Sequence, residues 1–529
     1  LEFRRVLFRS ISAGIEAFGL IRNLSLNLPN IVSFKSPLTI NNRLEIFQGT
    51  ADLRNLTKAD TVMNKSVLLS SPELRIVSNF NNSGLFTNRS GLVSFTGSGF
   101  ITGTVIPEFY NLTISGSLSA PSEISVAGDL MNDGVFNPNS GTVVLTGNSK
   151  QKIGGASRLD FYNLLVSNSS DTVSIQTPVS IIGTLDVAPG AIFNAGNNLL
   201  QLTYKDVNHQ GKIGVLEPTA KILGQLSMQR FVPGSVRGYR YLSSPLAGFT
   251  IGGLYGYFPF DPFYFFSYDE SVTGNKTAGF YRPDFSEQMR PGRGFVFWPT
   301  GQDAFNGINW TANGELQTGV NRDLVNLNVM YTPTAGGSYE NDGWNLMGNP
   351  YPSPIKWSAD VLAWSDDKNA KFRGIDPVVF VWDNITGNYQ TWNALTGMGD
   401  LSESTGVIAS GQAFWVHAYQ QNPSLVIHEA AKSTQNTEMI RSDKVSSEGF
   451  SISLIHDKIR SSSFFAIFDA ATENFDEGMD AVQMSGGPAP AISLLSKNGI
   501  PLVHYLSDTT PDHIDLKLAQ IHAGYFKII

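Results

Sequence analysis

The sequence contains no cysteine, few charged residues and no long apolar run, and each absence excludes a class of protein. Without cysteine there can be no disulfide framework, no cysteine-ligated zinc site and no thiol nucleophile. No stretch reaches the roughly 18 consecutive apolar residues that a membrane-spanning helix needs, so we expect no transmembrane helix. Charged residues make up 16% of the chain and the formal net charge is -8, which argues against nucleic acid or an anionic membrane as partner.

The motifs of several common enzyme classes are also missing. The chain has no HExxH pair, no GxSxG nucleophile elbow, no GxxxxGK[ST] phosphate loop and no GxGxxG after a strand. Among the seven histidines, His417 and His428 bracket a predicted strand pair and could meet across a hairpin, but we favour a structural or surface role for them.

What the sequence does contain is an internal repeat. When the chain is shifted by 50 residues, NNSGLFTNRSGLVSFTG (81–97) aligns with MNDGVFNPNSGTVVLTG (131–147), with eight identities. Slightly further on, FYNLTIS at Phe109 recurs as FYNLLVS at Phe161. A recurrence of this length indicates stacked units, none of which can bury its apolar face alone.

Within these repeats the apolar residues alternate, which predicts short strands. The residues expected to point the same way are Tyr110, Leu112 and Ile114 in one copy and Tyr162, Leu164 and Val166 in the other. Only eleven charged residues occur between Asn81 and Leu200. Stacked rungs would bring like charges within about 4.8 Å of each other, so sparse charge suits stacking. We therefore predict a parallel β-solenoid (β-helix) over residues 11–225, with about two turns per repeat. The alternative is a set of antiparallel sandwiches.

From Met228 the composition changes, and all eight tryptophans lie between Trp298 and Trp415. A second repeat appears, with copies about 114 residues apart. RYLSSP corresponds to WNLMGNP, YDESVTGN to WDNITGN, and RPGRGFVFW to ASGQAFWVH. We therefore expect two similar β-rich lobes over residues 226–435, with VVFVWD and YQTW forming a hairpin.

The remaining segments complete an all-β architecture. Residues 436–448 are polar and read as a linker, and the alternation from residue 449 to residue 529 predicts a β-sandwich. The chain stops in an apolar run, GYFKII, so we expect a truncated C-terminus. Leu1–Ser10, LEFRRVLFRS, resembles a translated sequencing adapter and is left out of the expected fold.

One family resemblance rests on GWNLMGNPYPSPIKW (343–357), together with the FYNL repeat, WDNITGNY, GQAFWV and NFDEGMDAVQM. With these strings the chain resembles large secreted proteins of Bacteroidota. Those proteins carry a solenoid stalk, this aromatic module, a β-sandwich and a C-terminal sorting domain read by the type IX secretion system. The resemblance covers most of residues 80–510 and implies export to the cell surface. The sorting domain itself is missing here, so this route is inferred from neighbouring modules.

The tryptophan-rich region contains the best binding candidates. Trp382, Trp392 and Trp415 lie beside predicted turns and could form a platform on which sugar rings stack. The alternative, which we favour, is that these rings fill the cores of small lobes. The segment PFDPFYFFSYD (259–269) is too aromatic to be fully solvated, and we expect it to pack between the lobes.

Acidic clusters are weaker candidates. A turn-rich segment could bind calcium through oxygen ligands, with four candidates: Glu473, Asp476, Glu477 and Asp480. Their spacing matches no known calcium loop, so solvated turns are favoured and no cofactor is expected. Carboxylate pairs for glycoside hydrolysis would be Asp269 with Glu270, or Asp400 with Glu403.

Three functions follow from these observations. The first is an extracellular, non-enzymatic structural or adhesin-like surface protein, exported by type IX secretion, in which the solenoid is a spacer. The second is a carbohydrate-binding surface protein that uses the tryptophan-rich lobes. The third is a β-helix polysaccharide lyase or hydrolase. A lyase usually needs an acidic, calcium-binding groove and a basic residue on one solenoid face, which this sparsely charged solenoid does not favour.

Overall fold

The computed structural model describes residues 6–8, 20–33, 38–52, 56–64, 67–69, 73–87, 90–197, 200–234, 238–257, 260–300, 306–316, 324–337, 339–359, 362–363, 374–384, 387–401, 405–437, 439, 449–456, 459–467, 471–475, 480–484, 490–507, 513–519 and 527–529. Within these ranges one short α-helix, α1 (Ile251–Tyr255), and one 3₁₀ helix, η1 (Glu429–Ala431), accompany the strands. The predicted all-β class is confirmed. The chain divides into two compact units, Leu1–Lys205 with His209–Ser227 and Asp206–Asn208 with Met228–Ile529.

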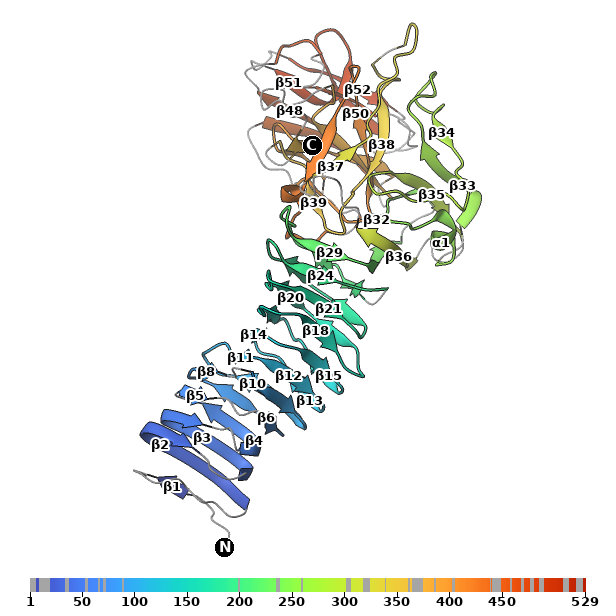
Figure 1. Cartoon of the computed structure of the whole chain (residues 1–529). Coiled ribbons are helices and arrows are strands. Elements are labelled where there is room, and N and C mark those ends of the chain that lie inside the picture. The colour runs from blue at the N-terminus through green and yellow to red at the C-terminus, as the bar shows by residue number, and fades with distance from the viewer. Residues whose placement is uncertain are drawn as a thin grey trace. The chain divides into compact units, whose positions relative to one another are not determined.

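The first unit is a parallel β-solenoid, as the first repeat predicts. From residue 73 to residue 202 it makes about six turns. Each turn contributes three short strands, so a strand pairs in parallel with the third strand before it and the third strand after it (Figure 1). The first stack contains β6 (Glu73–Ile76), β9 (Leu92–Phe95), β12 (Asn111–Ile114), β15 (Leu130–Asn132), β18 (Gln151–Gly154), β21 (Thr172–Ile175) and β24 (Ile192–Asn194). The second contains β7 (Phe80–Asn82), β10 (Ser98–Thr102), β13 (Ser117–Ser119), β16 (Val135–Asn137), β19 (Leu159–Phe161), β22 (Val179–Ile181) and β25 (Leu200–Leu202). The third contains β8 (Phe86–Thr87), β11 (Glu108–Phe109), β14 (Glu123–Val126), β17 (Thr142–Leu145), β20 (Asn163–Val166) and β23 (Thr184–Val187).

Other strands lie before and after these turns. The preceding strands are β1 (Val6–Phe8), β2 (Leu20–Ser33), β3 (Leu38–Asp52), β4 (Leu56–Asn64) and β5 (Val67–Leu69). The following strands are β26 (Tyr204–Asp206), β27 (His209–Gln210), β28 (Lys212–Ile213) and β29 (Lys221–Leu223). β1 falls within the segment that we leave out of the expected fold, yet it pairs in parallel with β2.

Alternate residues of the short strands fill the solenoid interior. β12 buries Leu112 and Ile114 completely, as the period-two pattern predicts. Burying a side chain of this size contributes roughly 1.5–3 kcal/mol. Tyr110, predicted on the same side, is only half-buried, because it forms the corner between β11 and β12 where the chain changes direction. Phe109 points into the interior instead, and the second copy of the FYNL motif behaves in the same way.

The turns are shorter than the repeat suggests. In the first stack Val93 pairs with Leu112 and Leu112 pairs with Leu130, so one turn takes 19 residues and the next takes 18. The expectation of about two turns per repeat is therefore wrong. Val93 lies on β9 in the first stack, whereas its repeat partner Val143 lies on β17 in the third. Eight strands, or two and two-thirds turns, separate the two copies.

The two copies of the repeat share a structural feature: an asparagine at the end of a strand whose buried side-chain amide hydrogen-bonds to a backbone carbonyl. Asn82 and Asn132 are aligned by the repeat and are both completely buried, although they lie in different stacks. The Asn82 amide donates to the Val105 carbonyl at 3.0 Å, and the Asn132 amide donates to the Arg158 carbonyl at 2.8 Å. A buried amide can hydrogen-bond to backbone carbonyl groups without adding a charge. This suits a solenoid whose turns stack ~4.8 Å apart, because like charges at that spacing would repel each other.

In the second unit, two antiparallel sheets share the order of four equivalent strands, as two similar lobes would, and the second sheet has one strand more. The first sheet runs β31-β35-β33-β34 and the second runs β38-β45-β41-β42-β43. Their strands are β31 (Arg240–Leu242), β33 (Phe260–Tyr268), β34 (Phe280–Tyr281) and β35 (Phe295–Pro299), then β38 (Trp344–Gly348), β41 (Val378–Asp383), β42 (Asn388–Asn393), β43 (Met398–Gly399) and β45 (Ala413–His417). The predicted hairpin is β41 with β42. The other strands in this region belong to further sheets: β30 (Gln225–Val232), β32 (Leu246–Ala247), β36 (Ile308–Leu316), β37 (Leu324–Leu327), β39 (Ile355–Lys356), β40 (Leu362–Ala363), β44 (Val407–Ile408) and β46 (Leu425–His428).

Reciprocal backbone contacts join the two lobes. Leu242 at the end of β31 forms a bridge with Gln412, and Met347 of β38 forms a bridge with Arg293. In the repeat alignment Leu242 corresponds to Met347 and Arg293 corresponds to Gln412. The two contacts are therefore equivalent, and the lobes meet through equivalent edges.

The C-terminal segment, predicted as a β-sandwich, forms one seven-stranded sheet that curls into half a barrel. Its strands are β47 (Gly449–His456), β48 (Ile459–Ile467), β49 (Ala481–Val482), β50 (Ala491–Leu495), β51 (Pro501–Ser507), β52 (Asp515–Ala519) and β53 (Lys527–Ile528). Phe465, Leu502 and Tyr505 share one hydrophobic core with Trp344 and Trp415. The curled sheet therefore packs on the second lobe, which supplies the opposing layer. The linker expected at residues 436–448 lies largely outside the described residues, and the boundaries at 435 and 449 remain predictions.

Candidate functional site

The structure brings two of the three predicted platform tryptophans together and separates the third. In the β41–β42 hairpin, Trp392 pairs with Val379, which lies three residues before Trp382. Successive residues of a strand point to opposite faces, so Trp382 and Trp392 lie on opposite faces of the sheet. Trp415 of β45 pairs with Phe380, which places it on the face of Trp382.

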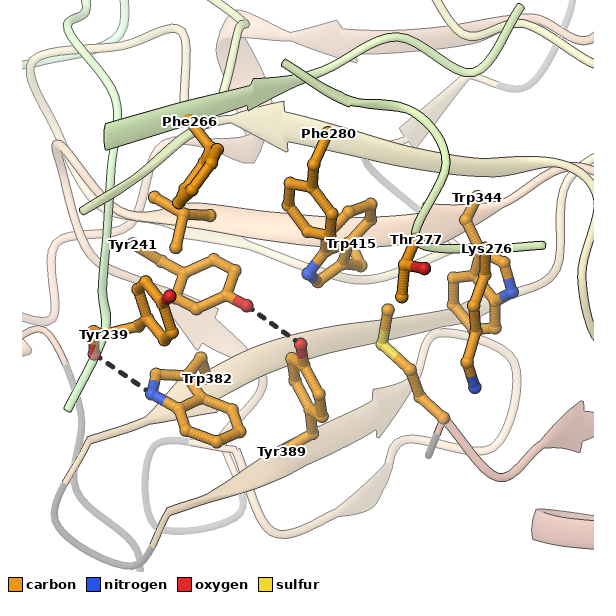
Figure 2. Close-up of a pocket in the computed structure, with 12 residues that line it drawn as sticks. Tyr239, Tyr241, Phe266, Lys276, Thr277, Phe280, Trp344, Trp382, Tyr389 and Trp415 are labelled. Atoms are coloured by element: carbon orange, nitrogen blue, oxygen red, sulfur yellow. Dashed lines mark hydrogen bonds between the residues drawn. The ribbon is translucent and has the colours of Figure 1, made fainter. Parts of the chain in front are cut away.

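Trp382 and Trp415 line a pocket of about 290 Å³, which we call the aromatic pocket. Figure 2 shows its side chains converging from both lobes. The first lobe contributes Tyr239, Tyr241 and Phe266, and the second contributes Trp382, Tyr389 and Trp415. Two of the three predicted platform residues therefore line one concave pocket, in which Trp415 is 2% exposed, as the favoured role in the core implies. The third, Trp392, is buried and lines a different pocket.

Several polar groups lie among these rings. The Tyr241 and Tyr389 hydroxyls are hydrogen-bonded to each other at 3.0 Å, and the Trp382 indole N–H donates to the Tyr239 carbonyl at 3.1 Å. The Trp415 indole nitrogen is buried and has no hydrogen-bond partner within 3.5 Å among the described residues, although the Tyr241 and Tyr389 hydroxyls lie near enough for the indole to influence their pKa values. A buried donor without an acceptor costs about 1–3 kcal/mol, so the Trp415 N–H favours a ligand that brings an acceptor.

Burial dominates the behaviour of both hydroxyls. It raises the pKa of Tyr241, which the hydrogen bond with Tyr389 and the nearby Trp415 indole oppose. Burial also raises the pKa of Tyr389 well above 10.0, with a further contribution from Tyr241. Both hydroxyls therefore keep their protons at neutral pH, and a ligand meets groups that can donate as well as accept.

Lys276 supplies the positive charge in the lining of the aromatic pocket, at the end opposite Tyr239 (Figure 2). Burial lowers the pKa of this half-buried ammonium, and the carboxylate of Glu340 partly opposes the shift. Thr277 adds a hydroxyl beside it. The described lining thus offers aromatic faces, hydroxyls, one indole N–H and one ammonium.

A second pocket, of about 380 Å³, contains the predicted carboxylate pair Asp269 and Glu270. The Glu270 carboxylate accepts hydrogen bonds from the Thr332 N–H at 2.7 Å, from the Thr332 hydroxyl at 2.8 Å and from the Gly343 N–H at 3.2 Å. Asp269 accepts from the backbone N–H and the hydroxyl of Ser271. These bonds hold loops in place, and they leave the pair poorly suited to acid–base chemistry.

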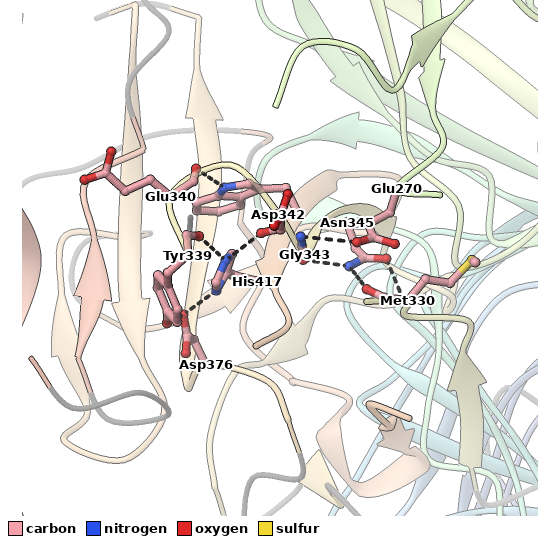
Figure 3. Close-up of polar contacts among 10 residues, drawn as sticks. Glu270, Met330, Tyr339, Glu340, Asp342, Gly343, Asn345, Asp376 and His417 are labelled. Atoms are coloured by element: carbon pink, nitrogen blue, oxygen red, sulfur yellow. Dashed lines mark hydrogen bonds and ion pairs between the residues drawn. The ribbon is translucent and has the colours of Figure 1, made fainter. Parts of the chain in front are cut away.

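His417 belongs to a buried polar network (Figure 3). Its Nδ1 lies 2.8 Å from the Asp376 carboxylate, and both side chains are 1% exposed. The Asp376 carboxylate also accepts from the Tyr339 hydroxyl. The Nε2 atom lies 2.9 Å from the carbonyl oxygens of Tyr339 and Asp342. Because carbonyl oxygens only accept, Nε2 is the donor in these contacts, and both ring nitrogens of His417 take part in structural hydrogen bonds. His428 lies in another sheet, so the expected meeting across a hairpin is wrong.

The acidic calcium candidates serve other contacts where the structure describes them. Glu473 pairs with a lysine at 2.6 Å, and Asp480 is buried and accepts from a backbone N–H at 2.7 Å. Asp400, of the alternative hydrolytic pair, accepts from a backbone N–H at 2.7 Å. Outside the described residues lie Asp476, Glu477 and Glu403.

Within the described part of the chain, no group of three or more His, Asp or Glu side chains is placed to hold a metal ion. None of the helices described there is long and apolar enough to cross a membrane.

The tyrosines of the pocket are not among the predicted site residues, although the alignment of the two copies of the second repeat could have identified Tyr241. The repeat aligns Tyr241 with Leu346 and Val296 with Trp415. Tyr241 pairs with Val296 in the first lobe, and Leu346 pairs with Trp415 in the second. These equivalent pairs both face the boundary between the two lobes, which we call the seam. Once the face of Trp415 is known, the alignment identifies Tyr241 as its counterpart across the pocket.

Comparison with known proteins adds a family. No curated protein and no solved structure matches the chain. One family model matches residues 133–528, a range that includes solenoid turns and every residue of the aromatic pocket. Because this match covers more than half of the 529 residues, the chain belongs to the family described as a domain of unknown function, DUF8693.

Proposed function

We propose that this chain is an extracellular, non-enzymatic, adhesin-like surface protein that binds a glycan in the aromatic pocket. The observation that carries the proposal is the pocket itself, where aromatic faces from both lobes surround two hydroxyls and the unpartnered N–H of Trp415. A sugar ring has C–H-rich faces that stack on aromatic rings and hydroxyls that donate and accept hydrogen bonds. The volume of about 290 Å³ suits one small unit.

The chemistry of the lining supports binding without catalysis. Its described residues include no carboxylate and no imidazole, the groups that most often transfer protons in hydrolysis. The carboxylates of Asp269 and Glu270 and the imidazole of His417 are occupied by structural hydrogen bonds elsewhere. A lyase or hydrolase would need such groups free and directed at the sugar, so we rank it below binding.

The solenoid supplies the spacer in this proposal. About six turns, each rising ~4.8 Å, extend roughly 30 Å. Hydrogen bonds between parallel strands and a buried apolar interior make such a stack stiff. Because few of its residues are charged, neighbouring turns do not repel each other. A spacer of this kind would hold a binding module away from the surface that carries it.

The resemblance to secreted Bacteroidota proteins supports the location. We propose export by type IX secretion and display on, or release from, the outer-membrane surface. The partners would be an extracellular glycan and the type IX secretion machinery. No cofactor is part of the proposal.

A glycan array probed with the full chain tests the binding. We expect sugar-dependent binding that is lost in Trp382→Ala, because this ring lines the pocket. Trp392→Ala is the matched control, since Trp392 comes from the same hairpin but lies on the opposite face. It should keep binding, provided that its tryptophan fluorescence shows a folded protein. Equal loss in both variants, or no binding by the parent chain, contradicts the proposal.

Labelling intact cells tests the location. An antibody against the chain should stain unpermeabilised cells that carry the gene, and added protease should remove the signal. Staining that appears only after lysis would rule out surface display.

A further inference from the structure

One wall of the aromatic pocket is a row of three residues across the first lobe. Tyr241 of β31 pairs with Val296 of β35, and Val296 pairs with Phe266 of β33. All three line the pocket. Residues two apart on a strand share a face, so Trp298 continues this side of β35 beyond Val296. Tyr239, just before β31, and Tyr264, in the irregular part of β33 between Phe260 and Phe265, both have ring contacts with Trp298 and form a second row with it.

This second row, which we call the aromatic track, is a continuous line of rings. The centroids of Tyr239 and Trp298 are 5.0 Å apart, and those of Trp298 and Tyr264 are 6.4 Å apart. Tyr239 also lines the pocket, so the track starts at the pocket wall. Tyr239 and Trp298 are half-buried and Tyr264 is 48% exposed, so the track leads from the pocket into solvent.

The exposure of Tyr264 differs from expectation. We predict that the segment 259–269 packs between the lobes, and Phe265 is indeed 2% exposed, but its neighbours Phe263 and Tyr264 face solvent. Phe263 lies under the guanidinium of Arg282 at 4.5 Å, which partly covers it. Among the described residues Tyr264 has a ring contact with Trp298, and 48% of the residue is exposed and available to a ligand.

We propose that the glycan is a chain whose terminal unit occupies the aromatic pocket and whose following units lie on the aromatic track. This inference rests on the proposed function and adds to it the length of the glycan that binds. Rings spaced at 5.0 and 6.4 Å match successive units of an oligosaccharide better than a single sugar, which the pocket alone would hold. A lipid tail or an apolar peptide would bring no acceptor to the buried Trp415 N–H, nor to the one hydroxyl proton that the hydrogen bond between Tyr241 and Tyr389 leaves over.

Calorimetric titration of the full chain with four defined series tests the inference. The probes are cello-, chito-, xylo- and galacturono-oligosaccharides of one to five units. Two variants separate the parts of the site: Trp382→Ala in the pocket and Tyr264→Ala at the end of the track. Tyr257→Ala is the control, because Tyr257 is a comparably exposed tyrosine of the same lobe, at 45%, outside the row.

We expect affinity in at least one series to rise about three- to tenfold for each unit that gains an aromatic contact, up to three units. Tyr264→Ala should remove the last of these gains and leave the affinity for one unit unchanged, whereas Tyr257→Ala should change neither. Equal affinity for one and five units, or wild-type behaviour of Tyr264→Ala, overturns the track but leaves the pocket. Failure of every series to bind overturns the proposed function as well.

Discussion

His504 should make the second unit lose stability as the pH falls below 6.5. The imidazole is 2% exposed; its Nε2 lies 3.0 Å from the Thr391 hydroxyl and its ring stacks on Phe464. Burial lowers the pKa of His504 from 6.5 to about 3. Between these values the unfolded chain binds a proton that the folded chain does not, so the free energy of unfolding falls as the pH falls.

The size of the effect follows from the two pKa values. Each pH unit in this window is worth about 1.4 kcal/mol, so lowering the pH from 7.5 to 5.0 should remove about 2 kcal/mol through His504. His504→Gln keeps a polar group near Thr391 but cannot titrate. It should be less stable than the parent at pH 7.5, yet lose about 2 kcal/mol less than the parent on acidification.

Urea unfolding followed by tryptophan fluorescence measures this difference. All eight tryptophans lie between residues 298 and 415, in the same unit as His504, so the signal reports that unit. His513→Gln is the control because His513 is exposed to solvent, and its stability difference between the two pH values should match the parent. If His504→Gln and the parent lose the same stability between pH 7.5 and pH 5.0, the reasoning is refuted.

Three further predictions concern the solenoid, the polar network and the pocket. Gly155 has φ +113° and a Cβ there would lie 2.2 Å from a backbone oxygen, whereas at Gly190, with φ +79°, the nearest atom would be 3.5 Å away. Thermal melting by circular dichroism should therefore show a larger loss for Gly155→Ala, by about 2 kcal/mol or more, and equal losses would contradict the steric argument. Asp376→Ala removes the partner of His417 Nδ1 and should cost roughly 3–5 kcal/mol in urea unfolding; a change below about 1 kcal/mol would indicate a weak pair. Val296→Phe should fill the aromatic pocket, weaken sugar binding at least tenfold and change stability by less than about 1.5 kcal/mol; unchanged binding would place the ligand elsewhere.

The solenoid is predictable because its signals are local and repeated. Alternating residues such as Leu112 and Ile114 set the inward face of each short strand, and sparse charge favours stacking in register. The length of a turn is not predictable in this way, because the duplicated segment spans eight strands and a turn uses three. The error at Tyr110 has a similar cause, since a corner interrupts the alternation that holds within a strand.

The candidate site was only partly predictable. Hairpin register alone separates Trp392 from Trp382, because Trp392 pairs with Val379, an odd number of residues from Trp382. Assigning Trp382 and Trp392 to opposite faces needs only the position of the hairpin turn, which the sequence predicts. The partners of His417 come from Tyr339, Asp342 and Asp376, more than 40 residues away in the chain, and no periodicity relates them.

The aromatic pocket can be traced to a difference between the two copies of the lobe. Equivalent positions face the seam between the lobes, with Tyr241 beside Val296 in one copy and Leu346 beside Trp415 in the other. In the second lobe the indole of Trp415 covers its own sheet, whereas the short side chain of Val296 leaves space in front of the first sheet. Trp415 and Trp382 border that space from the opposite lobe without filling it. Duplication thus supplies two matching aromatic faces, and one smaller residue is enough to leave a ligand-sized pocket in what would otherwise be a continuous core.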